Sequence, residues 1–208
     1  MNRKPLKHIC MDWLCSGFCL LLIGLDVYLV TRPVFDLNHL PIQACTIGIL
    51  FLLFYSAFGI RFCFDLACYW CAAGVFNALV FPDLPQEVTL NGFLYHVLGH
   101  LIPFLFVCYY LFNRKLLPPL SGPFYAIVAY CGIGYTVMVP LNFYTGANYF
   151  YLMGPPGFES LPLVLSLCWG VFISSYLLIL NLIWDYVFRA IDLCIMRRDP
   201  VAYLESSE

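Results

Sequence analysis

Charged residues are scarce in this chain, and their scarcity argues against a soluble protein. Only 11% of the 208 residues are charged, 62% are hydrophobic, and the mean hydropathy is +0.86. Soluble domains are usually about 25% charged and about 45–50% apolar. The net charge of −2 comes with no cluster of basic residues, so we expect no binding to nucleic acid.

Motifs for metal binding and for secretion are also missing. No second CxxC and no nearby histidine pair accompanies Cys68 and Cys71, so we interpret this CxxC as packing within a helix. Most of the eleven cysteines lie in apolar runs, where a free thiol behaves as a small hydrophobe. The first apolar run is about twenty residues long and no small-residue cleavage site follows it, which favours a retained helix over a secretory signal.

What the chain does contain is six apolar runs, each long enough to cross a hydrocarbon core about 30 Å thick. Turn-forming residues separate most of the runs, while only Gly59 and Arg61 mark the break between the second and the third. The predicted helices cover residues 11–31, 40–60, 62–81, 93–112, 124–141 and 161–188. We therefore predict an all-α bundle of about six transmembrane helices, forming one integral membrane domain over residues 1–208.

The basic residues predict the orientation of this bundle. In a six-helix arrangement only Arg32 falls on one side, and all the other lysines and arginines fall on the opposite side. They are Arg3, Lys4, Lys7, Arg61, Arg114, Lys115, Arg189, Arg197 and Arg198. The positive-inside rule makes that side cytoplasmic, so both ends of the chain are predicted to be inside. We also expect Asp65 and Asp185 to pair with the arginines four residues away, Arg61 and Arg189.

This orientation places polar residues from distant segments in one outer layer. Ionisable groups inside a membrane helix are costly, so each is a candidate for function. His96 and His100 are spaced i and i+4 and share one helical face. The predicted layer contains Gln43, Cys45, His96, His100, Asn142, Asn148 and Tyr149.

A cysteine and a histidine in this layer suggest acyl-transfer chemistry. A hydrogen-bonded imidazole raises the thiolate fraction of a thiol, and the resulting thioester passes its acyl group to a second substrate. Asn148 is a candidate to orient the imidazole or to stabilise an oxyanion. The alternative is that His96 and His100 satisfy hydrogen bonds between helices while Cys45 only packs.

Four segments, in order, resemble the bacterial YwaF-type integral membrane proteins, which are related to an animal transmembrane acyltransferase of ether phospholipids. The segments are residues 40–45, residues 66–70 continuing through 78–84, residues 99–101 and residues 145–152. By resemblance, Cys45 matches the acyl-carrying nucleophile and His100 matches its partner. The chain departs from the family pattern at Gln43, where the family often has histidine.

The resemblance implies a phospholipid acyltransferase in a bacterial cell membrane, with membrane lipids as its partners. Cys45 and His100 are then the catalytic residues, and Gln43, His96, Asn142, Asn148 and Tyr149 are expected to contact substrate. Thiol-based acyl transfer needs no cofactor or metal, and no motif for either is present. Two non-catalytic alternatives stay open, a small transporter and a scaffold for another membrane protein. The apolar inner halves of the second, fourth and fifth helices argue against a pore through the bundle.

Overall fold

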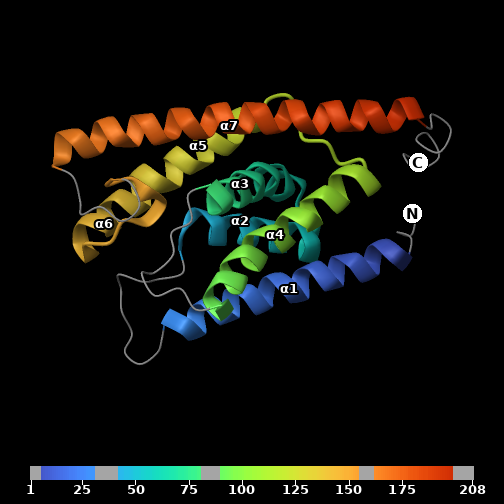
Figure 1. Ribbon diagram of the computed structural model, residues 1–208, viewed down its shortest axis with the longest axis horizontal. Helices are drawn as coiled ribbons and strands as arrows, with labels where there is room; N and C mark the ends of the chain where they lie inside the picture. Colours follow the sequence, from blue (N-terminus) through green and yellow to red (C-terminus); the bar gives the residue numbers. More distant parts are fainter. Residues whose placement is uncertain (1–5, 31–41, 81–89, 155–161, 199–208) are drawn as a thin grey trace.

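The computed structural model describes residues 6–30, 42–80, 90–154 and 162–198 (Figure 1). Within these ranges 88% of the residues are helical and none forms a strand, so the all-α prediction is confirmed. Arg3, Lys4 and Arg32 lie outside the described residues. The helices are α1 (Leu6–Val30), α2 (Ala44–Phe58), α3 (Arg61–Val80), α4 (Leu90–Asn113), α5 (Gly122–Ile133), the π-helical turn η2 (Gly134–Met138), α6 (Val139–Thr145), the 3-10 turn η3 (Tyr149–Tyr151) and α7 (Leu163–Arg198).

Helix α3 is the centre of the bundle. It contacts α2, α4, α5 and α7, and Figure 1 shows it surrounded by them. In its membrane span 61% of the residues are buried, against 22–28% in the other four long spans. Those other spans expose large apolar side chains, as helices facing lipid do. Glycine lets α2 approach α3 closely, because a Cβ on Gly48 would lie only 3.1 Å from the Cβ of Trp70.

Helix α2 is shorter than the sequence predicts. It has 15 residues, or about 22 Å of helix, and is the one predicted span too short to cross a bilayer alone. Its first residue is Ala44. The preceding residue, Gln43, has an extended backbone (φ −65°, ψ 159°), and its side chain makes no capping hydrogen bond to α2. The helix ends at Phe58, two residues before the predicted end, and Gly59 forms the break that the sequence predicts. Gly59 adopts a left-handed conformation (φ 71°) and donates its N–H to the carbonyl of Tyr55.

The predicted fifth helix is divided into α5, η2 and α6. The π turn ends two residues before Pro140, which has no N–H to give to the carbonyl of Thr136 four residues earlier. The N–H of Val139 bonds instead to the carbonyl of Gly134, five residues back. Gly134 also gives room to the loop that follows, since a Cβ there would lie 2.9 Å from Leu152 Cδ1.

Helix α7 continues ten residues beyond its predicted end at residue 188. Its 36 residues span about 54 Å, more than the hydrocarbon core requires. No breaker occurs before Pro200, so nothing in the sequence ends the helix earlier. The end of α7 and the start of α1 lie at the same end of the molecule in Figure 1.

Three arginine–aspartate pairs gather at this end, each with an N···O distance of 2.9 Å. They are Arg61–Asp65, Arg189–Asp185 and Arg114–Asp12, and the first two are the predicted pairs. Arg61 and Arg189 also donate to the carbonyls of Leu117 and Pro118, which joins α3 and α7 to the connection between α4 and α5.

Arg114 lies just outside its membrane span. Burial lowers the pKa of Arg114, but the hydrogen bond and the charge of Asp12 outweigh that effect and raise it overall. The guanidinium therefore stays charged at this end of the bundle. Tyr110 donates a further hydrogen bond of 3.0 Å to Asp12, so the carboxylate of this pair has two partners.

The orientation of the bundle stays a prediction, and two exposed cysteines of α7 test it. Cys168 and Cys194 lie 26 residues apart, or about 39 Å along the helix. We expect a membrane-impermeant thiol reagent to label Cys194 in inside-out vesicles and Cys168 in intact cells, measured by peptide mass spectrometry. The reverse pattern would contradict the N-inside arrangement.

Gly48 tests the close packing of α2 on α3. Gly48→Val would force side-chain atoms into Trp70, and overpacking of this kind costs about 1–3 kcal/mol. We expect a lower melting temperature in detergent. Gly132→Ala in α5 is the matched control, because no atom lies within 4 Å of its Cβ position and alanine favours helix. An unchanged melting temperature for Gly48→Val would show that the helices are not held this close.

Candidate functional site

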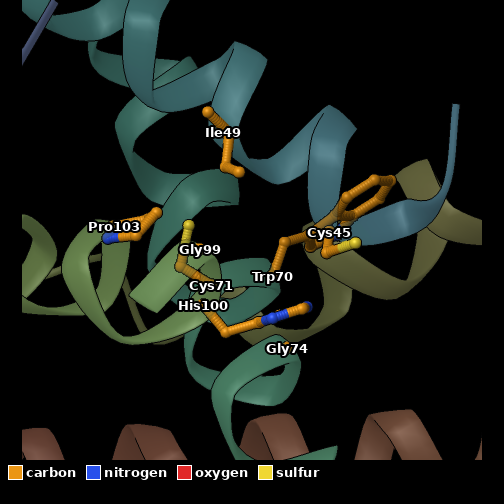
Figure 2. A pocket seen from close by; sticks show the side chains of 8 residues that line it. All are labelled: Cys45, Ile49, Trp70, Cys71, Gly74, Gly99, His100 and Pro103. Atoms are coloured by element: carbon orange, nitrogen blue, oxygen red, sulfur yellow. The ribbon is translucent and has the colours of Figure 1, made fainter. Parts of the chain in front are cut away.

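A small pocket lies between α2, α3 and α4, and two of the predicted site residues border it (Figure 2). It offers about 10 Å³ to a water-sized guest, which is room for about one water molecule. The predicted catalytic residues Cys45 and His100 both line it. The full lining is Cys45, Ile49, Trp70, Cys71, Gly74, Gly99, His100 and Pro103.

Gly74 is the residue that brings Cys45 and His100 to the same place. A Cβ on Gly74 would lie 3.7 Å from Cδ2 of His100 and 3.9 Å from Cβ of Cys45. The two side chains therefore flank one point on α3, although α2 and α4 carry them. Figure 2 shows the imidazole extending below Cys45 and toward Gly74. Both residues are half-buried, so the pocket is not sealed.

The hydrogen bonds of His100 determine its tautomer. Its Nδ1 lies 2.7 Å from the carbonyl oxygen of His96, one turn earlier in α4. A carbonyl oxygen only accepts, so Nδ1 carries the proton in the neutral ring. Nε2 then has the lone pair, which is the arrangement that a general base requires.

His96 holds its ring beside that of His100. Its Nε2 lies 3.3 Å from the carbonyl of Ala78 in α3, so this nitrogen is the protonated one, and the two imidazole centroids are 4.8 Å apart. His96 therefore links α4 to α3 next to the pocket without lining it. Its predicted role as a substrate-binding residue stays a prediction.

Cys45 has a polar neighbour on α1. Thr46, the next residue, donates a hydrogen bond of 3.4 Å to the carboxylate of Asp26. In the part of the chain that the structure describes, no hydrogen bond joins Cys45 to His100. A proton can therefore pass between them only if the side chains approach or if a water occupies the pocket.

The predicted residues after the fifth span form a buried loop, residues 146–154. The amide of Asn142, only 2% exposed, accepts from the N–H of Tyr149 at 2.8 Å and donates to its carbonyl at 3.0 Å. Asn148 accepts from the N–H of Met153 and donates to the carbonyl of Gly154, both at 2.9 Å. Both asparagines thus bind backbone here rather than facing Cys45 and His100, and their assignment to substrate stays a prediction.

Gln43 connects this loop to the start of α2. Its Oε1 accepts a hydrogen bond of 3.2 Å from the N–H of Phe150, a residue with positive φ (60°). The ring of Phe150 stacks on Tyr130 at 5.1 Å and meets Trp70 edge-on at 5.9 Å. Because Trp70 lines the pocket, the loop supports the pocket wall from behind.

Several lining residues were not identified from the sequence as part of a site. Trp70 belongs to a segment that carries the family resemblance, and Gly99 precedes His100 in another, while Cys71 is the second cysteine of the CxxC. Gly74 and Pro103 carry no reactive group. The available signals were a glycine in the most buried helix and a proline inside α4.

In a comparison with models of known protein families, the model described as the TMEM164 family matches residues 2–188 of this chain. No curated protein and no solved structure matches it.

The space beside Gly74 predicts which changes block the pocket. Gly74→Ala would place its methyl group at ordinary contact distance, so we expect the fold and the thiol reactivity to persist. Gly74→Leu would extend into the pocket between Cys45 and His100. We expect its Cys45 to react with iodoacetamide as slowly as the fully buried Cys68, measured peptide by peptide. Equal Cys45 reactivity in both variants would place the access route elsewhere.

Proposed function

This chain belongs to the TMEM164 family, and we propose that it is a phospholipid acyltransferase in which Cys45 carries the acyl group and His100 moves the proton. The observation that supports this most is the shared pocket, in which both side chains lie within 4 Å of one point at Gly74. The four segments that resemble YwaF-type proteins point to the same two residues. The chain is a multi-pass membrane protein, and its place in a bacterial cell membrane stays a prediction.

The first half of the proposed reaction forms a thioester. Nε2 of His100 accepts the thiol proton, and the sulfur of Cys45 attacks the ester carbonyl of a phospholipid. A C–S bond forms and the ester C–O bond breaks. The imidazolium returns its proton to the alkoxide that leaves, so a lysophospholipid departs and the acyl group stays on Cys45.

The second half transfers that acyl group. The hydroxyl of an acceptor gives its proton to Nε2 of His100 while its oxygen attacks the thioester carbonyl. The new C–O bond replaces the C–S bond, and the proton passes to the sulfur. Cys45 is thereby restored as a thiol, with no net oxidation and no need for a cofactor.

The surroundings of the pocket suit a lipid substrate. Leu79 on α3 is 61% exposed and Leu98 on α4 is 45% exposed, so two of the helices that border the pocket also present apolar side chains at the surface. The room for about one water excludes a whole headgroup. We infer that only the reacting groups of a lipid enter the pocket, while its acyl chain lies along the lipid-facing helices.

One observation favours the alternative, a non-catalytic membrane protein such as a small transporter or a scaffold. Cys45 and His100 are close but not hydrogen-bonded in the part of the chain described here, and His100 already has a partner in His96. In that case His96 and His100 would serve helix packing, and Cys45 would fill space.

Reactivity of the Cys45 thiol separates the two functions. We expect an electrophilic lipid analogue to label Cys45 of the purified wild type rapidly. In His100→Ala the loss of the general base should slow labelling by about 100-fold or more. The measurement is the labelling rate at Cys45 by mass spectrometry, with Cys45→Ser as the unlabelled reference.

His8→Ala is the matched control for this experiment. His8 also bonds through Nδ1, to the hydroxyl of Tyr109 at 2.9 Å, but it lies at the arginine-rich end of the bundle. We expect its labelling rate to equal that of the wild type. Slow labelling of the wild type, unchanged in His100→Ala, would contradict an activated thiol and favour the non-catalytic alternative.

A further inference from the structure

Two buried polar atoms of α7 have no hydrogen-bond partner within the part of the chain that the structure describes. They are Oδ1 of Asn181 and Nε1 of Trp184. Asn181 is only 3% exposed. Buried polar groups in native proteins almost always have a partner, so each exception requires an explanation. Both residues lie in the apolar span of α7, where bulk water is scarce and a missing partner is correspondingly costly.

Two other polar contacts join α7 to α3, and Asn181 lies between them. Tyr176 donates a hydrogen bond of 2.6 Å to Asn77, and Tyr69 of α3 donates one of 2.8 Å to Asp185. The two helices are therefore already joined by side-chain hydrogen bonds above and below Asn181. Its amide oxygen nevertheless receives no donor from either helix.

Aromatic rings surround the indole of Trp184. Its ring centroid lies 5.3 Å from that of Phe104 on α4 and 5.6 Å from that of Phe188, on which it stacks. These contacts restrain the ring, so its N–H cannot turn freely to another acceptor. Asn181 and Trp184 are spaced i and i+3, which puts their Cβ atoms about 5–6 Å apart on one face of α7. Two hydrogen bonds of about 2.9 Å each span a similar distance, so one oxygen atom between the two groups can serve both.

The two atoms determine which group fits between them. The indole N–H only donates, and the amide oxygen only accepts. An alcohol oxygen accepts through a lone pair and donates its single proton, so it satisfies both atoms and keeps no proton unpaired. A water molecule would bring a second O–H, which the rings of Phe104 and Phe188 cannot accept well. An anion would have no proton to give to Asn181.

The position along α7 indicates an uncharged alcohol. Asp185 and Arg189 form an ion pair four and eight residues after Asn181, or about 6 and 12 Å along the helix. The two atoms therefore lie one to two turns inside the arginine-rich end, at a depth where a charged phosphate is costly. Trp184 is partly exposed although its Nε1 is buried, so the ring borders the outer surface of the bundle. A lipid in the bilayer has access to that surface.

We propose that Asn181 and Trp184 bind the hydroxyl of an uncharged lipid alcohol such as a diacylglycerol. The indole N–H donates to the hydroxyl oxygen, and the hydroxyl donates its proton to Oδ1 of Asn181. The acyl chains of the lipid lie outside the bundle. Neither residue lines the pocket of Cys45 and His100, so this site does not depend on the proposed function.

The test uses the full-length protein in lipid nanodiscs and a diacylglycerol with a photoreactive diazirine in one acyl chain. Cross-linked peptides of α7 are quantified by mass spectrometry while an unlabelled lipid competes. The competitors are dioleoylglycerol and the dioleoyl ester of propane-1,2-diol, in which hydrogen replaces the hydroxyl. We expect dioleoylglycerol to compete about tenfold better or more, because the other diester lacks both hydrogen bonds. Equal competition in the wild type would overturn the proposal.

Two variants locate the hydroxyl. Trp184→Phe keeps an aromatic ring without the N–H, and Asn181→Leu keeps a similar volume without the oxygen. We expect each to lose most of the preference for dioleoylglycerol. Trp169→Phe is the matched control, because it is the same substitution in the same helix but its N–H already donates to the carbonyl of Tyr151 at 2.6 Å. Its preference should equal that of the wild type.

Three further results would overturn the site. A preference that persists in both Trp184→Phe and Asn181→Leu would place the hydroxyl elsewhere. A lower melting temperature of Asn181→Leu without added diacylglycerol would show that its oxygen already has a partner in the protein. Magnetisation transfer from water to the Trp184 indole N–H, unchanged by dioleoylglycerol, would assign the position to water. If neither variant folds, the competition in the wild type decides alone.

Discussion

A backbone polar group that is buried away from water must find its partner inside the protein, and the buried loop at residues 146–154 is where this constraint acts most strongly. Here the chain is not regularly helical, yet Tyr149, Phe150 and Leu152 are each no more than 2% exposed. Side chains complete its hydrogen bonds: Asn142 from the end of the fifth span, Gln43 from the start of α2, and the hydroxyl of Tyr130. Each bond also positions an element around the pocket. Gln43, two residues before Cys45, fixes the start of α2. Phe150 packs against Trp70, which lines the pocket. The geometry of the candidate site therefore depends on the backbone hydrogen bonds of a loop that does not itself line the pocket.

Much of the fold could be predicted from the sequence because lipid imposes simple rules. Length and apolarity located the spans, and Gly59 and Arg61 marked the tight turn between α2 and α3. The i, i+4 spacing identified the pairs of Asp65 and Asp185 with their arginines. The structure departs from the predicted helices where the conformation of a residue depends on a partner that is distant in the sequence. Apolarity does not reveal that Gln43 leaves the helix to bind Phe150. Nor does it reveal that Pro140 introduces a π turn while Gly134 makes room for Leu152.

The candidate site was predicted in part, for a related reason. Topology alone placed Cys45 and His100 at a similar depth, and the structure places both at one pocket. Depth does not give the rotation of each helix about its axis, so Gly74 in α3 and Pro103 inside α4 could not be assigned to the pocket from the sequence. The asparagines and the histidine of the predicted layer have different surroundings for a chemical reason. An asparagine amide offers a donor and an acceptor together, which is what a peptide group in a loop needs. Asn142 and Asn148 bind peptide groups in this way, whereas one carbonyl bond leaves His100 with a free lone pair.

Under the proposed function, the small size of the pocket limits what can reach the thiol of Cys45. A thioester on Cys45 would be exposed to attack only by what reaches a space for about one water, so its lifetime would depend on access rather than on bulk solvent. Under the proposed function Cys45 and His100 supply the reactivity, and access to the pocket between α2, α3 and α4 decides which nucleophile reaches them.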